Sequence, residues 1–92
     1  MTSKEIKKQR QEQNSEDLSE ARSLVLHNDD IHSFEYVTDA LIEICDHNYE
    51  QALQCALITH NKGKCDIKKG WLQTLRAMRT ALLERELNVT ID

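Results

Sequence analysis

The 92-residue sequence contains no proline, only two glycines, and only one Phe, one Trp and two Tyr residues. The lack of proline excludes a proline-rich linker, and two glycines do not make a glycine-rich loop that cradles phosphate groups. No apolar run approaches the roughly 18 residues that a membrane helix needs, and the N-terminus lacks the apolar segment of a signal peptide. We therefore expect a cytoplasmic protein that does not associate with membranes.

The chain also lacks an excess of positive charge. Its formal net charge is −4 at pH 7, and the basic residues near the N-terminus alternate with acidic ones and have no aromatic residues among them. This balance argues against nucleic acid or an anionic membrane as the main partner.

The chain has three cysteines, and their spacing does not indicate a metal site. Cys45, Cys55 and Cys65 follow one another at intervals of ten residues, which is not the spacing of zinc ligands. An odd number of cysteines in a chain without an export signal indicates reduced thiols. We therefore expect buried or half-buried free cysteines, with no metal and no cofactor.

The chain divides into a polar beginning and a single small domain. Residues 1–21 carry few apolar side chains and mixed charges, which predicts a flexible, disordered N-terminal extension. Residues 22–92 are then left to form one domain with a modest core.

The first elements follow from hydrophobic periodicity. Residues 22–27 form a short apolar run that ends in Asn-Asp-Asp and is typical of a strand, although so short a run also fits part of a helix. A helix is predicted from about residue 34, with Ser33 or Asp30 as its N-cap and Glu35 in its first turn. Its apolar face comprises Phe34, Val37, Leu41 and Ile44.

A second helix is predicted over about residues 48–62. Asn48 followed by Gln51 resembles a capping box, and Gly63 is suited to the left-handed conformation that ends many helices. Tyr49, Leu53, Ala56, Leu57 and His60 are expected to share one face of this helix.

The last third of the chain predicts a helix between two strands. Residues 64–68 are either a short strand or a connector, and residues 70–86 form a helix whose core stripe comprises Trp71, Leu75, Met78 and Leu82. Residues 86–92 alternate apolar and polar, as a half-buried strand does. We therefore predict an α+β fold, a small three-stranded antiparallel sheet with three helices, in the order β-α-α-β-α-β.

The run Asn28-Asp29-Asp30 is the most informative polar feature. Such a run after a strand is usually a turn or a helix cap, because Asn and Asp hydrogen-bond their own backbone. The two aspartates could also serve as an acid/base pair, but no activated nucleophile accompanies them. A third interpretation is recognition of an ammonium group, whose three donors need about three acceptors. His60, if neutral, could supply one of these, although a histidine near a helix end is usually there for other reasons.

The residues around this run resemble the ClpS family of adaptor proteins, which deliver substrates to the Clp ATP-dependent protease. Two blocks carry the resemblance, "VLHNDDIHSFEYV" (25–37) and "ALQCALITHNKGKC" (52–65). The first has a strand ending in Asn-Asp-Asp followed by Glu35-Tyr36-Val37, and the second has a helix ending in His60-Asn61-Lys62-Gly63-Lys64. The resemblance covers about residues 22–92.

The resemblance implies an adaptor, not an enzyme, that binds N-degron substrates, which begin with Leu, Phe, Tyr or Trp. By matching position, Asn28, Asp29 and His60 would bind the α-amino group, while Asp30 and His32 would be further contacts. The side-chain pocket would be lined by Phe34, Val37, Ala56 and Thr59. The partner would be the N-terminal domain of a Clp-type AAA+ unfoldase, with Arg76 as a docking residue.

The sequence also departs from the family pattern. Where many members have Thr-Pro-Met, this chain has His32-Ser33-Phe34, and Phe34 is stiffer and wider than methionine. Ala56 falls where a larger apolar residue is common, which would deepen the pocket. The alternative hypothesis is therefore a ClpS-like regulatory module that docks on the unfoldase without reading N-termini.

Overall fold

The computed structural model describes residues 21–92, and its elements alternate as predicted. They are β1 (Arg22–His27), α2 (Phe34–Cys45), α3 (Tyr49–Lys62), β2 (Lys64–Gly70), α4 (Leu72–Glu84) and β3 (Asn88–Ile91). The predicted α+β class and its β-α-α-β-α-β order are thus confirmed. The extension predicted over residues 1–21 lies outside the described residues, apart from Ala21.

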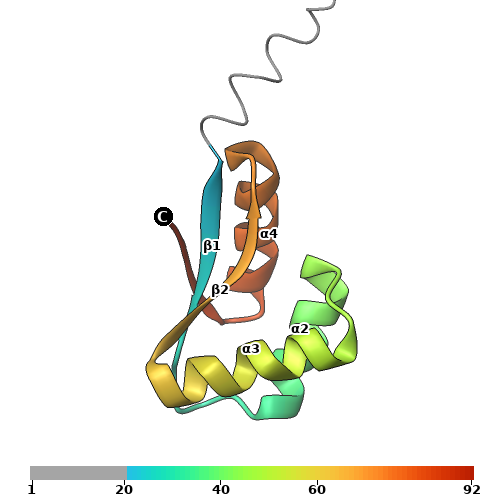
Figure 1. Cartoon of the computed structure of the whole chain (residues 1–92), viewed down its shortest axis with the longest axis vertical. Coiled ribbons are helices and arrows are strands. Elements are labelled where there is room, and N and C mark those ends of the chain that lie inside the picture. The colour runs from blue at the N-terminus through green and yellow to red at the C-terminus, as the bar shows by residue number, and fades with distance from the viewer. Residues whose placement is uncertain (1–20) are drawn as a thin grey trace, which may run out of the picture.

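The sheet has β1 at its centre, paired antiparallel with β2 on one side and β3 on the other. Leu26 of β1 lies opposite Cys65 and Val89, and a bulge interrupts the β1–β2 ladder between Leu24 and Val25. Helix α4 runs alongside the sheet, whereas α3 crosses its lower end, where β1 leaves the sheet and β2 enters it (Figure 1). The segment after β1 therefore passes close to the C-terminal end of α3.

Local capping explains where α2 and α3 begin and end. The Ser33 hydroxyl accepts a hydrogen bond from the backbone N–H of Tyr36 at 3.0 Å, so Ser33, and not Asp30, is the N-cap of α2. The Asn48 carboxamide does the same for the N–H of Gln51 at 2.7 Å. Gly63 ends α3 with a φ of +94°, which glycine adopts without the steric penalty of other residues.

The residues predicted to share one face of α3 differ in their burial. Tyr49 is 62% exposed and His60 is also exposed. The side chains of α3 that are buried are instead the small ones, Ala52, Cys55, Ala56 and Thr59. Small residues let the α3 backbone lie close to α2 and β2, and this packing outweighed the periodicity of the larger residues.

The region around Trp71 also corrects the prediction. Trp71 is the N-cap residue of α4 and is 37% exposed, so it is not part of the core stripe. The helix is shorter than predicted because β2 continues through Gly70, which pairs with Arg22 at the start of β1. The segment 64–68 is therefore a strand and not merely a connector.

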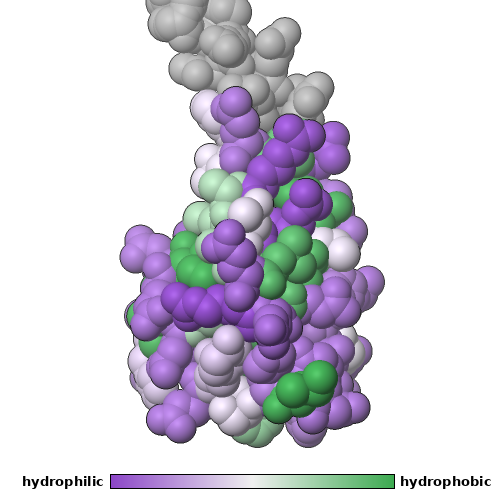
Figure 2. All heavy atoms as spheres, turned by 180° about the vertical axis from the view of Figure 1, so that it is seen from behind, coloured by the Kyte–Doolittle hydropathy of each residue, from purple (hydrophilic) through white to green (hydrophobic). Residues whose placement is uncertain are grey.

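The core forms where the sheet meets the three helices. Its largest fully buried side chains are Leu24, Leu26, Leu41, Leu75, Leu82, Val25 and Cys45. On the face seen in Figure 2 the surface is mostly polar, and its apolar side chains occur in small separate groups. Within residues 21–92 no helix has both the length and the apolar character needed to cross a membrane.

Candidate functional site

The turn after β1 is fixed to the end of α3 by the backbone. The N–H of Asn28 donates to the carbonyl of Gly63 at 2.9 Å. This hydrogen bond joins the two sequence blocks that carry the predicted site, because His60 lies one turn before Gly63 on α3. The polar run and the histidine are thus held on the same side of the domain.

Asp29 organises this turn. One of its carboxylate oxygens accepts the backbone N–H groups of Ile31 and His32, at 2.9 and 3.1 Å. The other lies 2.9 Å from Nδ1 of the His32 ring. An ionised carboxylate can only accept, so Nδ1 of His32 carries the proton. The turn interpretation of Asn-Asp-Asp is therefore correct for Asp29.

The electrostatic environment of Asp29 favours its charged form. Burial by itself would raise the pKa of this carboxyl group, but the hydrogen bonds from the Ile31 N–H, the His32 ring and the His32 N–H outweigh it. The net result is a pKa below the ordinary value. Asp29 is thus a fixed negative charge in the wall of the site at neutral pH.

Asn28 and Asp30 have more acceptor capacity left than Asp29. The Asn28 carboxamide nitrogen donates to Oδ1 of Asp30 at 3.3 Å, which leaves the carboxamide oxygen of Asn28 free to accept. Both residues are exposed, and among the described residues no hydrogen bond occupies the second carboxylate oxygen of Asp30. These oxygens and the exposed ring of His60 surround an open mouth lined by Asn28, Asp29, Asp30, His32, Ser33, Phe34 and His60.

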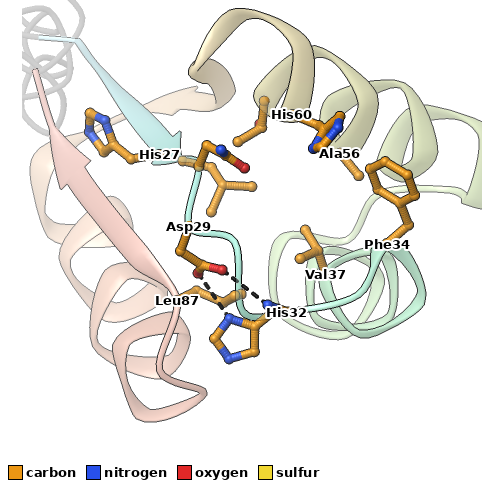
Figure 3. A pocket seen from close by; sticks show the side chains of 11 residues that line it. His27, Asp29, His32, Phe34, Val37, Ala56, His60 and Leu87 are labelled. Atoms are coloured by element: carbon orange, nitrogen blue, oxygen red, sulfur yellow. Dashed lines mark hydrogen bonds and ion pairs between the residues drawn. The ribbon is translucent and has the colours of Figure 1, made fainter.

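Beneath this mouth lies a narrower hollow that we call the inner hollow. It measures about 360 Å³ including its open rim. The structure brings together here all seven residues predicted to bind the amino group or the side chain, Asn28, Asp29, His60, Phe34, Val37, Ala56 and Thr59. Figure 3 shows Phe34, Ala56 and His60 on one side of the hollow and Asp29 with His32 on the opposite side.

Phe34 and His60 meet at the edge of the inner hollow. Their rings pack edge to face, with centroids 5.3 Å apart and an interplanar angle of 81°. The floor is formed by Ala56 and Thr59, which are 3% and 5% exposed. The Thr59 hydroxyl donates to the carbonyl of Cys55 at 2.7 Å, so it adds no unpaired donor to the floor.

Three lining residues were not predicted, namely Leu26, His27 and Leu87. Leu26 and His27 directly precede the polar run, so their position on the strand could have indicated them. Leu87 comes from the segment between α4 and β3, and no local pattern connects it to the site. Arg76 lies exposed on α4 and does not line the inner hollow.

The cysteines stand apart from the polar site. Cys45 and Cys55 are buried free thiols, and Cys65 is a half-buried one. Within residues 21–92 no group of three His, Cys, Asp or Glu side chains is arranged to hold a metal ion.

The site therefore combines an apolar hollow with a rim of carboxylate and carboxamide oxygens. The family model described as "ATP-dependent Clp protease adaptor protein ClpS" matches residues 18–89, so the chain belongs to the ClpS adaptor family. The structure is also similar to that of Agrobacterium tumefaciens ClpS2 bound to L-phenylalaninamide. The TM-score is 0.71 at 19% sequence identity, over 78% of this chain and 94% of that chain. No curated protein sequence matches.

Proposed function

We propose that this protein is an adaptor, without catalytic activity of its own, that binds the free α-amino group and the bulky apolar first side chain of N-degron substrates. It would deliver them to a Clp-type AAA+ unfoldase in the cytoplasm by docking on the N-terminal domain of that unfoldase. The observation that carries the proposal is the convergence of the seven predicted residues on the inner hollow, although they come from α2, α3 and the turn after β1.

We assign the α-amino group to the mouth because of its hydrogen-bonding needs. An ammonium has three donors, and around one opening Asn28, Asp30 and His60 offer acceptors that no other residue within 21–92 occupies. Asp29 supplies a nearby negative charge while holding the turn in place. Charge-assisted hydrogen bonds of this kind contribute roughly 1.5–3 kcal/mol each.

The first side chain of the substrate would enter the inner hollow between Phe34, Val37 and Ala56. Burying a Leu or Phe side chain contributes roughly 1.5–3 kcal/mol. After the cost of ordering the peptide, this contribution and the polar contacts are compatible with a dissociation constant in about the micromolar range. The ligand named for the ClpS2 structure, L-phenylalaninamide, combines a free amino group with an apolar side chain, which supports the same ligand class here.

A peptide titration tests the proposal. Peptides that begin with Leu, Phe, Tyr or Trp should bind, while the same peptides with an acetylated N-terminus should bind at least tenfold more weakly. Equal binding of free and acetylated peptides would overturn the proposal and favour the alternative of a regulatory module that docks without reading N-termini. Docking itself is tested by pull-down with an isolated unfoldase N-terminal domain, with Arg76→Ala as the candidate docking variant.

Two variants separate the roles of the neighbouring carboxylates. Asp30→Asn should weaken peptide binding while leaving the free energy of unfolding nearly unchanged, because Asp30 is exposed and makes few internal contacts. Asp29→Asn should weaken binding and also lower stability, because three hydrogen bonds within the turn depend on its carboxylate.

A further inference from the structure

The two edges of the sheet differ in how they are protected against pairing with another chain. β1 is the central strand, so β2 and β3 are both edge strands. β2 carries Lys64, Lys68 and Lys69, and a bulge interrupts its pairing with β1. Lysines and bulges are two common means by which proteins keep an edge strand from pairing further. β2 is thus a protected edge.

β3 has neither form of protection. Its sequence, Asn-Val-Thr-Ile, contains no lysine and no proline, and its register with β1 runs without a bulge. Valine, threonine and isoleucine all favour strands. β3 lies on the side of β1 away from β2, and no helix of the described residues lies beyond it in Figure 1. An unprotected edge of this kind is a place where another strand can be added.

The hydrogen bonds between β1 and β3 determine which backbone groups of β3 point outward. Ser23 and Asp92 exchange both of their backbone hydrogen bonds, at 3.3 and 2.8 Å. In an antiparallel ladder such pairs alternate with pairs that exchange none, so Thr90 bonds to β1 whereas Val89 and Ile91 do not. The N–H and C=O groups of Val89 and Ile91 therefore point away from the sheet. Within the described part of the chain, no hydrogen bond occupies them.

The outer edge of β3 is complementary to a second copy of itself. Two antiparallel β3 strands centred on Thr90 place Val89 of each copy opposite Ile91 of the other, so that all the outward backbone groups are hydrogen-bonded. The same register sets Thr90 opposite Thr90 and Asn88 opposite Asp92. A pair of threonines, and a carboxamide that donates to a carboxylate, both stabilise neighbouring strands.

The two faces of such a strand pair also match. Val89 belongs to the hydrophobic core and Ile91 packs against it, so apolar side chains meet on the core side. Asn88, Thr90 and Asp92 are exposed, and they alternate with the apolar residues, so polar side chains meet on the other side. Asp92 is the one charged residue of this segment, and it faces a neutral side chain in the other copy. No like charges oppose each other in this register.

We propose that β3 is a self-association edge, through which two copies of the chain pair antiparallel and join their three-stranded sheets into one. The inference does not depend on the proposed function. Strands of four residues bury little area, so we expect a weak dimer with a dissociation constant on the order of 100 µM. Leu87 lines the inner hollow and directly precedes β3, so the dimer carries its two hollows at opposite ends of the joined strands.

Self-association is tested by sedimentation velocity at chain concentrations from about 10 µM to about 1 mM. The 10.7 kDa monomer should give way to a species of twice its mass as the concentration rises. Amide hydrogen exchange over the same range locates the interface. Exchange at Val89 and Ile91 should slow roughly two- to fivefold, whereas the N–H of Thr90, which bonds to β1, should exchange equally slowly at all concentrations.

A charge swap tests the register. Asn88→Asp places a carboxylate opposite Asp92 at both ends of the strand pair, and should raise the dissociation constant of the dimer roughly tenfold. Adding Asp92→Asn restores a carboxylate facing a carboxamide at the net charge of the wild type, and should return the dissociation constant to within about twofold of the wild-type value. Asn61→Asp, at an exposed position near the end of α3, is the matched control and should leave the dissociation constant unchanged.

Three results would overturn the proposal. The first is a chain that stays monomeric at the highest concentration. The second is a dimer in which the Val89 and Ile91 amides remain unprotected, or which Asn88→Asp does not weaken, because the copies would then join through another surface. The third is protection of these amides only after a peptide ligand is added, which would assign the edge to a strand of the ligand.

Discussion

The ring of His32 lies flat against the ring of Tyr36, with centroids 4.7 Å apart and an angle of 17° between the planes. Tyr36 is itself anchored, because its hydroxyl donates to the carbonyl of Arg85 at 2.9 Å. The imidazole is thus held on its face by the aromatic ring and at Nδ1 by Asp29. This arrangement connects the turn of the candidate site to the C-terminal end of α4.

This geometry predicts different effects for two substitutions of His32. His32→Phe keeps the stacking but removes the donor to Asp29, and should lower the free energy of unfolding by about 1–2 kcal/mol. It should also weaken binding of a Leu-first peptide several-fold. His32→Asn places an amide donor near the position of Nδ1 and should restore most of the binding. Urea unfolding and peptide titration measure both, and equal losses in the two variants would contradict a specific role for the donor.

The lowered pKa of Asp29 predicts a dependence of stability on pH. A carboxyl group whose pKa is lower in the folded than in the unfolded state stabilises the fold above its unfolded pKa, and this contribution is lost as the pH falls through the folded pKa. The stability difference between wild type and Asp29→Asn should therefore be full at pH 7 and shrink below the ordinary value of 3.8. Urea unfolding between pH 7 and 2.5 checks this, and a constant difference would argue against an ionised Asp29 in the turn.

The floor of the inner hollow predicts a change in substrate choice. Ala56→Leu would project three more carbon atoms into the space that we assign to the first side chain. Peptides beginning with Phe or Trp should bind at least tenfold more weakly, because overfilled cores and pockets cost roughly 1–3 kcal/mol. Fluorescence anisotropy with labelled peptides measures this. The control Ala77→Leu, at an exposed position of α4, should leave affinity unchanged.

Substitution of His47 is expected to lower the stability of the fold without acting on the candidate site. It is 4% exposed, and its Nε2 donates to the carbonyl of Ile67 in β2 at 2.7 Å. His47→Phe would keep most of the volume but leave that carbonyl unpaired, at a cost of about 1–3 kcal/mol. Urea unfolding should show this loss, whereas Gln54→Ala on the exposed face of α3 should change stability by less than about 0.5 kcal/mol.

The raised pKa values of the cysteine thiols predict slow reaction with alkylating agents. Burial raises the pKa of Cys45 to about 11. Burial together with the neighbouring Cys55 raises that of Cys65 to about 12. Because the thiolate is the reactive form, alkylation by iodoacetamide at pH 7 should be far slower in the folded than in the urea-unfolded protein. Mass spectrometry of a time course measures the rates, and rapid modification of Cys65 at pH 7 would contradict this assignment.

Much of the fold could be predicted because its signals are local. Ser33, Asn48 and Gly63 mark helix ends through bonds to their own neighbours, and the alternation in residues 86–92 follows from one buried face. The core position of Trp71 was predicted wrongly, and the buried face of α3 was not predicted, because exposure at both places depends on which elements pack nearby. The length of β2 likewise depends on its pairing with Arg22.

The candidate site could be predicted only in part, for a related reason. Asn28 and His60 are polar residues beside apolar runs, and the family resemblance predicts that they lie in one site. The bonds between Asp29 and His32 depend on the turn conformation, which no spacing rule specifies. Leu87 reaches the hollow from the far end of the chain, so only the folded structure could identify it.

Because β1 is the central strand, both the core and the candidate site depend on its correct pairing register. Successive residues of a strand face opposite sides, so a slip of one residue would turn Leu24 and Leu26 away from the core. The same slip would break the bond between Asn28 and Gly63 and separate the polar turn from His60. A chain paired in the wrong register would therefore lose its core and its ligand site together. Under the proposed function, misregistered copies would therefore not bind substrates.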